Sequence, residues 1–65
     1  NLIEVHSNKK IDIIESNENL KNIINLGDKS EFIYRLSFEN KKELQKLKEE
    51  IEKLENIKKI DVNYV

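Results

Sequence analysis

The second half of the chain changes from one hydrophobic period to another, and this change restricts the fold more than any other feature. Apolar side chains first recur at every second position, at Phe32, Tyr34, Leu36 and Phe38. Such alternation is typical of a strand with one buried face, so we expect a strand over Glu31–Phe38. The spacing then becomes three and four residues, at Leu44, Leu47, Ile51 and Leu54. This spacing predicts a helix over Asn40–Glu55 with one narrow apolar stripe.

Asn40 is expected to cap this helix, because its side chain can accept a hydrogen bond from an N–H group of the first turn. Glu43 lies three positions later, which is the spacing of a capping box. Three pairs of opposite charge, four residues apart, support the exposed faces; they are Lys46–Glu50, Lys48–Glu52 and Glu49–Lys53. An isolated coiled coil is the alternative, but the stripe spans only about two heptads.

A last strand is expected over Ile57–Tyr64, where Ile60, Val62 and Tyr64 share one face. Two strands of one sheet that are joined by a crossover helix form a right-handed unit, usually with parallel strands. The sequence therefore predicts a strand–helix–strand unit from residue 31 to the end of the chain.

The first thirty residues begin with an alternating strand over Leu2–His6 and then allow two interpretations. In the first, Lys9–Ser16 is a short helix with Ile11 and Ile14 directed inwards. Leu20–Leu26 is then a strand, and Gly27-Asp28-Lys29-Ser30 turns the chain.

In the second interpretation, Lys10–Glu15 is a strand paired with the first, and a helix through Leu20, Ile23 and Ile24 ends at Gly27. The β-branched isoleucines and the position of Gly27 favour this second interpretation. The first interpretation is favoured because βαββαβ is a recurrent two-layer fold for chains of this length, with two helices on one face of an antiparallel sheet. We expect an α+β fold, a two-layer ferredoxin-like βαββαβ sandwich, and ββαβαβ with an N-terminal hairpin stays as the alternative.

The length of 65 residues corresponds to one small domain over residues 1–65. Such a domain buries only about 60% of its unfolded surface, so a partner copy or the rest of a parent protein would stabilise it. Because the chain begins with Asn1, we expect a domain excised from a larger protein.

A net charge of −1 with both signs mixed gives no basic surface for phosphates, so we expect no nucleic-acid partner. The strand aromatics share their face with Leu36 and are interpreted as core rather than as a platform for bases. The lack of cysteine fits a reducing compartment. No apolar run reaches 18 residues and no signal peptide is present, so we expect a cytoplasmic segment that does not itself insert into a membrane.

The residues show no motif for catalysis, and we expect no enzyme. His6 is the only histidine, and without cysteine it cannot form a metal site of the usual nitrogen–sulfur type in a monomer. Glu4 lies on the same strand face as His6, but the pattern is that of a solvated or edge-strand histidine. The single Gly27 excludes phosphate-binding loops. We therefore predict no catalytic, cofactor-binding or metal-binding residues and no cofactor.

From Phe32 to Val62 the chain resembles the second half of an ACT-type domain. The resemblance lies in a strand, a helix with a Leu-x-x-Leu stripe, and an exit through Leu54, Ile57, Ile60 and Val62. Heavy-metal-associated domains share this half, but their paired cysteines are missing. ACT domains that bind amino acids carry a glycine in the turn after the first strand. Here that turn is Ser7-Asn8-Lys9-Lys10, so no ligand residue is carried over.

The resemblance implies side-by-side association of sheets and a regulatory or assembly role within a larger protein. ACT-like tails of this kind end alarmone synthetases and the cytoplasmic parts of MgtC/YhiD-like membrane proteins. We expect a non-catalytic regulatory or assembly domain that forms homo-oligomers and contacts the rest of its parent protein. A domain that senses an amino acid or a nucleotide at a dimer interface is the alternative.

Overall fold

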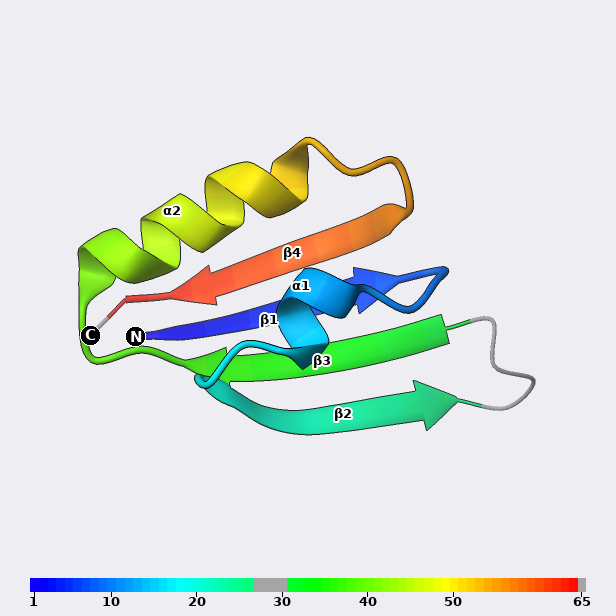
Figure 1. Cartoon of the computed structure of the whole chain (residues 1–65), viewed down its shortest axis with the longest axis horizontal. Helices are drawn as coiled ribbons and strands as arrows, with labels where there is room; N and C mark the ends of the chain where they lie inside the picture. The colour runs from blue at the N-terminus through cyan, green and yellow to red at the C-terminus, as the bar shows by residue number, and fades with distance from the viewer. Residues whose placement is uncertain (27–30, 65) are drawn as a thin grey trace.

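The computed structural model describes residues 1–26 and 31–64, which form a four-stranded sheet and two helices (Figure 1). The elements are, in order, β1 (Leu2–Ser7), α1 (Asp12–Glu15), β2 (Leu20–Leu26), β3 (Glu31–Ser37), α2 (Lys41–Glu52) and β4 (Ile57–Asn63). Neighbouring strands pair antiparallel in the order β2-β3-β1-β4. The chain is therefore a small α+β fold, and its arrangement is compatible with the ferredoxin-like sandwich that the sequence predicts.

The segment between β1 and β3 follows the first of the two interpretations. Ile11 and Ile14 are buried beside the single turn of α1, as expected for inward positions three residues apart. Leu20–Leu26 pairs with β3 as a strand, so neither the hairpin strand over Lys10–Glu15 nor the helix through Leu20 is present. The expected turn over residues 27–30 lies outside the described residues.

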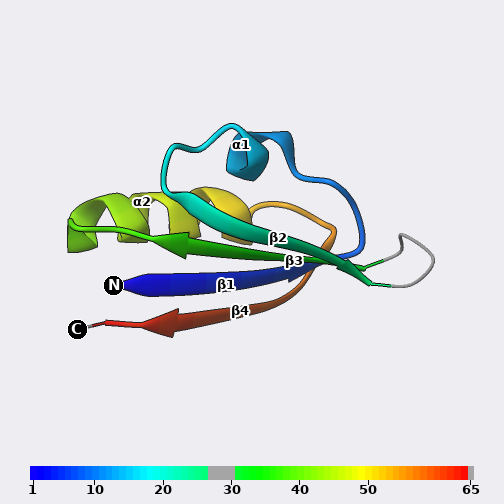
Figure 2. The same ribbon diagram turned by 90° about the horizontal axis from the view of Figure 1, so that it is seen from below.

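Both helices lie on the same side of the sheet (Figure 2). The core fills the space between them and the covered face of the sheet. It contains Tyr34 and Leu36 of β3, Phe38 just after this strand, and the helix residues Leu44, Leu47 and Ile51, together with Ile3, Val5, Ile11 and Ile14. The aromatic strand face predicted from the sequence is confirmed as core, with Phe32 packed at its margin and stacked on Tyr34, and the helix stripe is confirmed from Leu44 to Ile51.

The α2 helix begins where the sequence predicts and ends earlier. The Asn40 side chain accepts a hydrogen bond of 2.8 Å from the backbone N–H of Lys42, which confirms the cap. The helix stops at Glu52, and Leu54 is 39% exposed instead of extending the stripe. Among the expected charge pairs, Lys48–Glu52 is the one that forms within the described residues, at 3.8 Å.

The two strands of the predicted strand–helix–strand unit, β3 and β4, are not neighbours in the sheet. Because β3 and β4 both run antiparallel to β1, they run parallel to each other, as predicted, but β1 lies between them. The prediction for Tyr64 was wrong, since β4 ends at Asn63 and Tyr64 is 41% exposed. Its ring lies 4.7 Å from the Lys41 ammonium, an arrangement that favours a cation–π contact at the surface over burial.

Candidate functional site

One face of the sheet is left open, because α1 and α2 cover the opposite face and no other element among residues 1–26 and 31–64 lies over it (Figure 2). Side chains alternate along a strand, so the residues between the core positions point to this open face. Glu4 occupies its centre on β1. The strand register places Arg35 of β3 directly opposite Glu4 on one side and Asp61 of β4 on the other.

Glu4 accepts two hydrogen bonds from neighbouring groups. The Nε of Arg35 donates to its Oε1 at 2.7 Å, and the Nε2 of His6 lies 3.1 Å from its Oε2. The hydrogen bond from Arg35, followed by the one from His6, holds the pKa of Glu4 below its ordinary value of 4.5. Glu4 is therefore a charged carboxylate at neutral pH, with each oxygen assigned to a different partner.

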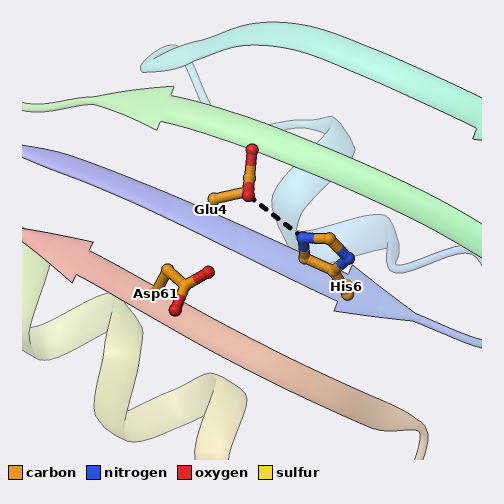
Figure 3. Close-up of side chains that lie close together, drawn as sticks. All are labelled: Glu4, His6 and Asp61. Atoms are coloured by element: carbon orange, nitrogen blue, oxygen red, sulfur yellow. Dashed lines mark hydrogen bonds and ion pairs between the residues drawn. The ribbon is translucent and has the colours of Figure 1, made fainter.

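His6 and Asp61 complete a compact group with Glu4 (Figure 3). One oxygen of each carboxylate and a ring nitrogen of His6 lie within 4.8 Å of one another. The His6 side chain is only 20% exposed, whereas that of Asp61 is 53% exposed and pairs with Lys59 at 3.3 Å. The group combines one imidazole and two carboxylates on two adjacent strands, β1 and β4.

A hollow of about 370 Å³ adjoins this group on the open face. It is lined by residues of all four strands, among them Lys21 and Asn22 of β2, Glu4, Arg35 and Asp61. Its volume lies within the range typical of small-molecule sites. Arg35 and Lys21 supply donors to it, and the two carboxylates supply acceptors.

The structure agrees in part with what the sequence suggests about these residues. Glu4 does lie on the same strand face as His6, as expected. The interpretation of His6 as an edge-strand histidine was wrong, because β1 is a central strand, and the His6 side chain keeps 20% exposure on the open face beside Glu4. Arg35 and Asp61 were not identified, since they approach Glu4 only through the pairing of β1 with β3 and β4. The sequence places Ile60 and Val62 on one strand face, and this alternation is the one signal that Asp61 between them lies on the other face.

The fold and this site define a small α+β protein with a polar, uncovered sheet face. Searches among protein-family models, curated proteins and solved structures found no match to the chain. Within the described ranges, neither helix has the length and apolar character needed to cross a membrane.

Proposed function

We propose that the chain is a non-catalytic, ACT-like regulatory or assembly domain with a complete ferredoxin-like fold. In this proposal it mediates oligomerisation of a larger protein, such as the cytoplasmic tail of an MgtC/YhiD-like membrane protein. The observation that carries the proposal is the contrast between the two edges of the sheet, which are β2 and β4. An edge strand exposes unpaired backbone N–H and C=O groups that can pair with another chain.

The two edges differ in charge. Both pairings at the edges contain a register shift, so charge is the feature that distinguishes β4 from β2. Charged side chains on an edge strand are a common device against pairing, and β4 carries Lys58, Lys59 and Asp61, all exposed. β2 carries Lys21 as its single charge, and its central residue Ile23 is 47% exposed. The less charged and more apolar β2 edge is therefore where a partner strand would add.

A second copy of the same chain fits this edge by symmetry. Two β2 strands paired antiparallel about a two-fold axis at Ile23 would form one continuous sheet across both copies. An axis perpendicular to the sheet keeps all helices on one face, and it brings the two Ile23 side chains together and out of water. Burial of this apolar surface would also add to the small core of each copy.

The test is the molar mass of the chain by light scattering across a wide concentration range. We expect a dimer that dissociates in an Ile23→Lys variant, because like charges opposite each other across an antiparallel pair are destabilising. Ile13→Lys is the matched control, since Ile13 has nearly the same exposure, 46%, but lies on α1. It should leave the dimer intact, and circular dichroism should show both variants folded.

A wild-type chain that is monomeric at every concentration would contradict the proposal. Dissociation by Ile13→Lys, with a dimer retained in Ile23→Lys, would instead place the contact on the helices and overturn the strand-edge geometry.

The hollow on the open face favours one second candidate, a domain that senses an amino acid or a nucleotide at a dimer interface. Lys21 and Asn22 of β2 line the hollow, so a partner paired along β2 would lie beside it. The Arg35 side chain is 54% exposed, and its guanidinium group can bind a carboxylate or a phosphate. Asp61 can accept hydrogen bonds from an ammonium group.

This second candidate predicts that a metabolite raises the thermal unfolding midpoint of the chain. A ligand at a hundredfold excess over its Kd adds about 2.7 kcal/mol to the unfolding free energy. The measurement is thermal unfolding with millimolar amino acids and nucleotides, compared between wild type, Arg35→Gln and the control Lys42→Gln on α2. The shift should disappear in Arg35→Gln alone, and a panel that shifts nothing would rule the candidate out.

A further inference from the structure

A separate use of the open face follows from the three side chains gathered on β1 and β4. Glu4 and His6 are two positions apart on β1 and project from the same face, and Asp61 is the direct cross-strand partner of Glu4. We propose that Glu4, His6 and Asp61 bind a divalent first-row transition ion such as Zn²⁺. This site is independent of the proposed assembly role, since it lies within one copy of the chain.

The donor set selects the class of ion. One imidazole and two carboxylates suit zinc and its neighbours in the first transition row, whereas Mg²⁺ and Ca²⁺ prefer oxygen ligands alone. This set differs from the nitrogen–sulfur type that the absence of cysteine excludes. Three protein ligands also leave a coordination position for water or for a group of another molecule.

The geometry of the group is close to that of a bound ion. Zinc–nitrogen and zinc–oxygen distances are about 2.0–2.2 Å, so two ligands of one ion lie about 3–4 Å apart. The Oε2 of Glu4 and the Nε2 of His6 are already 3.1 Å apart. The Asp61 carboxylate, within 4.8 Å of both, is exposed and can close the remaining distance by rotating its side chain (Figure 3).

Arg35 supports the site from outside. Its hydrogen bond goes to Oε1 of Glu4, so the ion competes with His6 alone for Oε2, and on binding it takes the place of the proton between Oε2 and the Nε2 of His6. A hydrogen bond to the second oxygen of a ligating carboxylate fixes its orientation, which is the usual role of partners around metal ligands. The arrangement orients Glu4 before the ion arrives.

Two cations lower the affinity of the site. Arg35 and Lys59 neutralise the two carboxylates, so we expect weaker binding than at a structural zinc site. The Lys59–Asp61 pair is exposed on both sides, at 61% and 53%, and such pairs contribute little stability. The ion can therefore displace Lys59 from Asp61, and removal of the Lys59 charge should strengthen binding.

The experiment is titration of the untagged chain with ZnCl₂, followed by calorimetry and by NMR of the His6 ring. His6 is the only histidine, so its ring signals are assigned without ambiguity. We expect one ion per chain and a shift of these signals. His6→Ala and Asp61→Asn should each weaken binding on the order of tenfold or more, since even outer partners of a metal contribute that much. Asp12→Asn, an exposed aspartate on α1, is the matched control and should bind as wild type does.

Lys59→Gln is a further test, because it should tighten Zn²⁺ binding. A variant that merely unfolds would weaken binding instead. Unchanged affinity in Asp61→Asn would show that Asp61 is not a ligand and would overturn the three-residue site. An unshifted His6 ring at millimolar Zn²⁺ would overturn it as well. Neither result would alter the molar-mass measurement on the β2 edge.

Discussion

Replacement of Ile14 with alanine is expected to lower the unfolding free energy by about 2–5 kcal/mol, the range for large-to-small changes in a core. Ile14 is fully buried, and it is the one residue of α1 whose side chain lies in the core. For a chain of this length the whole unfolding free energy is about 3–10 kcal/mol. The variant should therefore lose a large fraction of its stability and unfold at a much lower urea concentration than wild type.

Ile13 supplies the matched control for this prediction. It is the same residue type at the neighbouring position, but its side chain is 46% exposed. Ile13→Ala should change the unfolding free energy by no more than about 0.5 kcal/mol, as surface substitutions do. Urea denaturation followed by circular dichroism measures both. Equal losses in the two variants would mean that α1 does not pack on the sheet through Ile14.

Replacement of Tyr34 with phenylalanine is expected to have the second largest effect, a loss of about 1–3 kcal/mol. The buried hydroxyl of Tyr34 accepts a hydrogen bond of 3.0 Å from the backbone N–H of Ile11 and donates one of 2.7 Å to Glu15. Phenylalanine keeps the packing of the ring but leaves the Ile11 N–H without its partner. The measurement is again urea denaturation, with Tyr64→Phe at the exposed tyrosine as the control.

The same hydroxyl makes the unfolding free energy of the chain depend on pH in the alkaline range. Burial, together with the hydrogen bond to Glu15, raises the pKa of Tyr34 from 10.0 to about 12. A raised pKa in the folded state contributes stability that is fully present below pH 10 and is lost as the pH rises through 12. We expect wild type to lose about 2 kcal/mol from this source between pH 9 and pH 11.5. Tyr34→Phe should lack this part of the loss, and an equal decline in both proteins would contradict the assignment.

The sequence predicts the second half of the fold well because its signals are local. The alternation around Tyr34, the stripe through Leu44 and the cap at Asn40 each depend on neighbours along the chain. The segment around Ile11, Ile13 and Ile14 is different, since β-branched residues at those positions suit either a strand or one side of a helical turn. The contact that distinguishes the two, from the Tyr34 hydroxyl to the Ile11 N–H, joins residues 23 positions apart.

The site was less predictable for a related reason. Glu4 and His6 are near in sequence, and their shared strand face could be inferred. Arg35 and Asp61 reach Glu4 only through strand pairing, and the register of that pairing depends on the complete sheet. A one-residue slip of β4 would turn Asp61 to the core face and remove it from the group. The group therefore forms only with this strand register, and the register cannot be read from the residue types alone.

The position of β1 in the middle of the sheet also decides how the molecule responds to mechanical force. Leu2 pairs with Asn63, so the start of β1 and the end of β4 lie side by side at one end of the sheet (Figure 1). A force that separates these two ends loads the hydrogen bonds between the strands one pair at a time, beginning at Leu2 and Asn63, instead of shearing all of them together. Tension applied between Leu2 and Asn63 would separate β4 from β1 progressively, starting at these two residues. Because Asp61 leaves with β4, the group on the open face would come apart early, while β2 and β3 were still paired with each other.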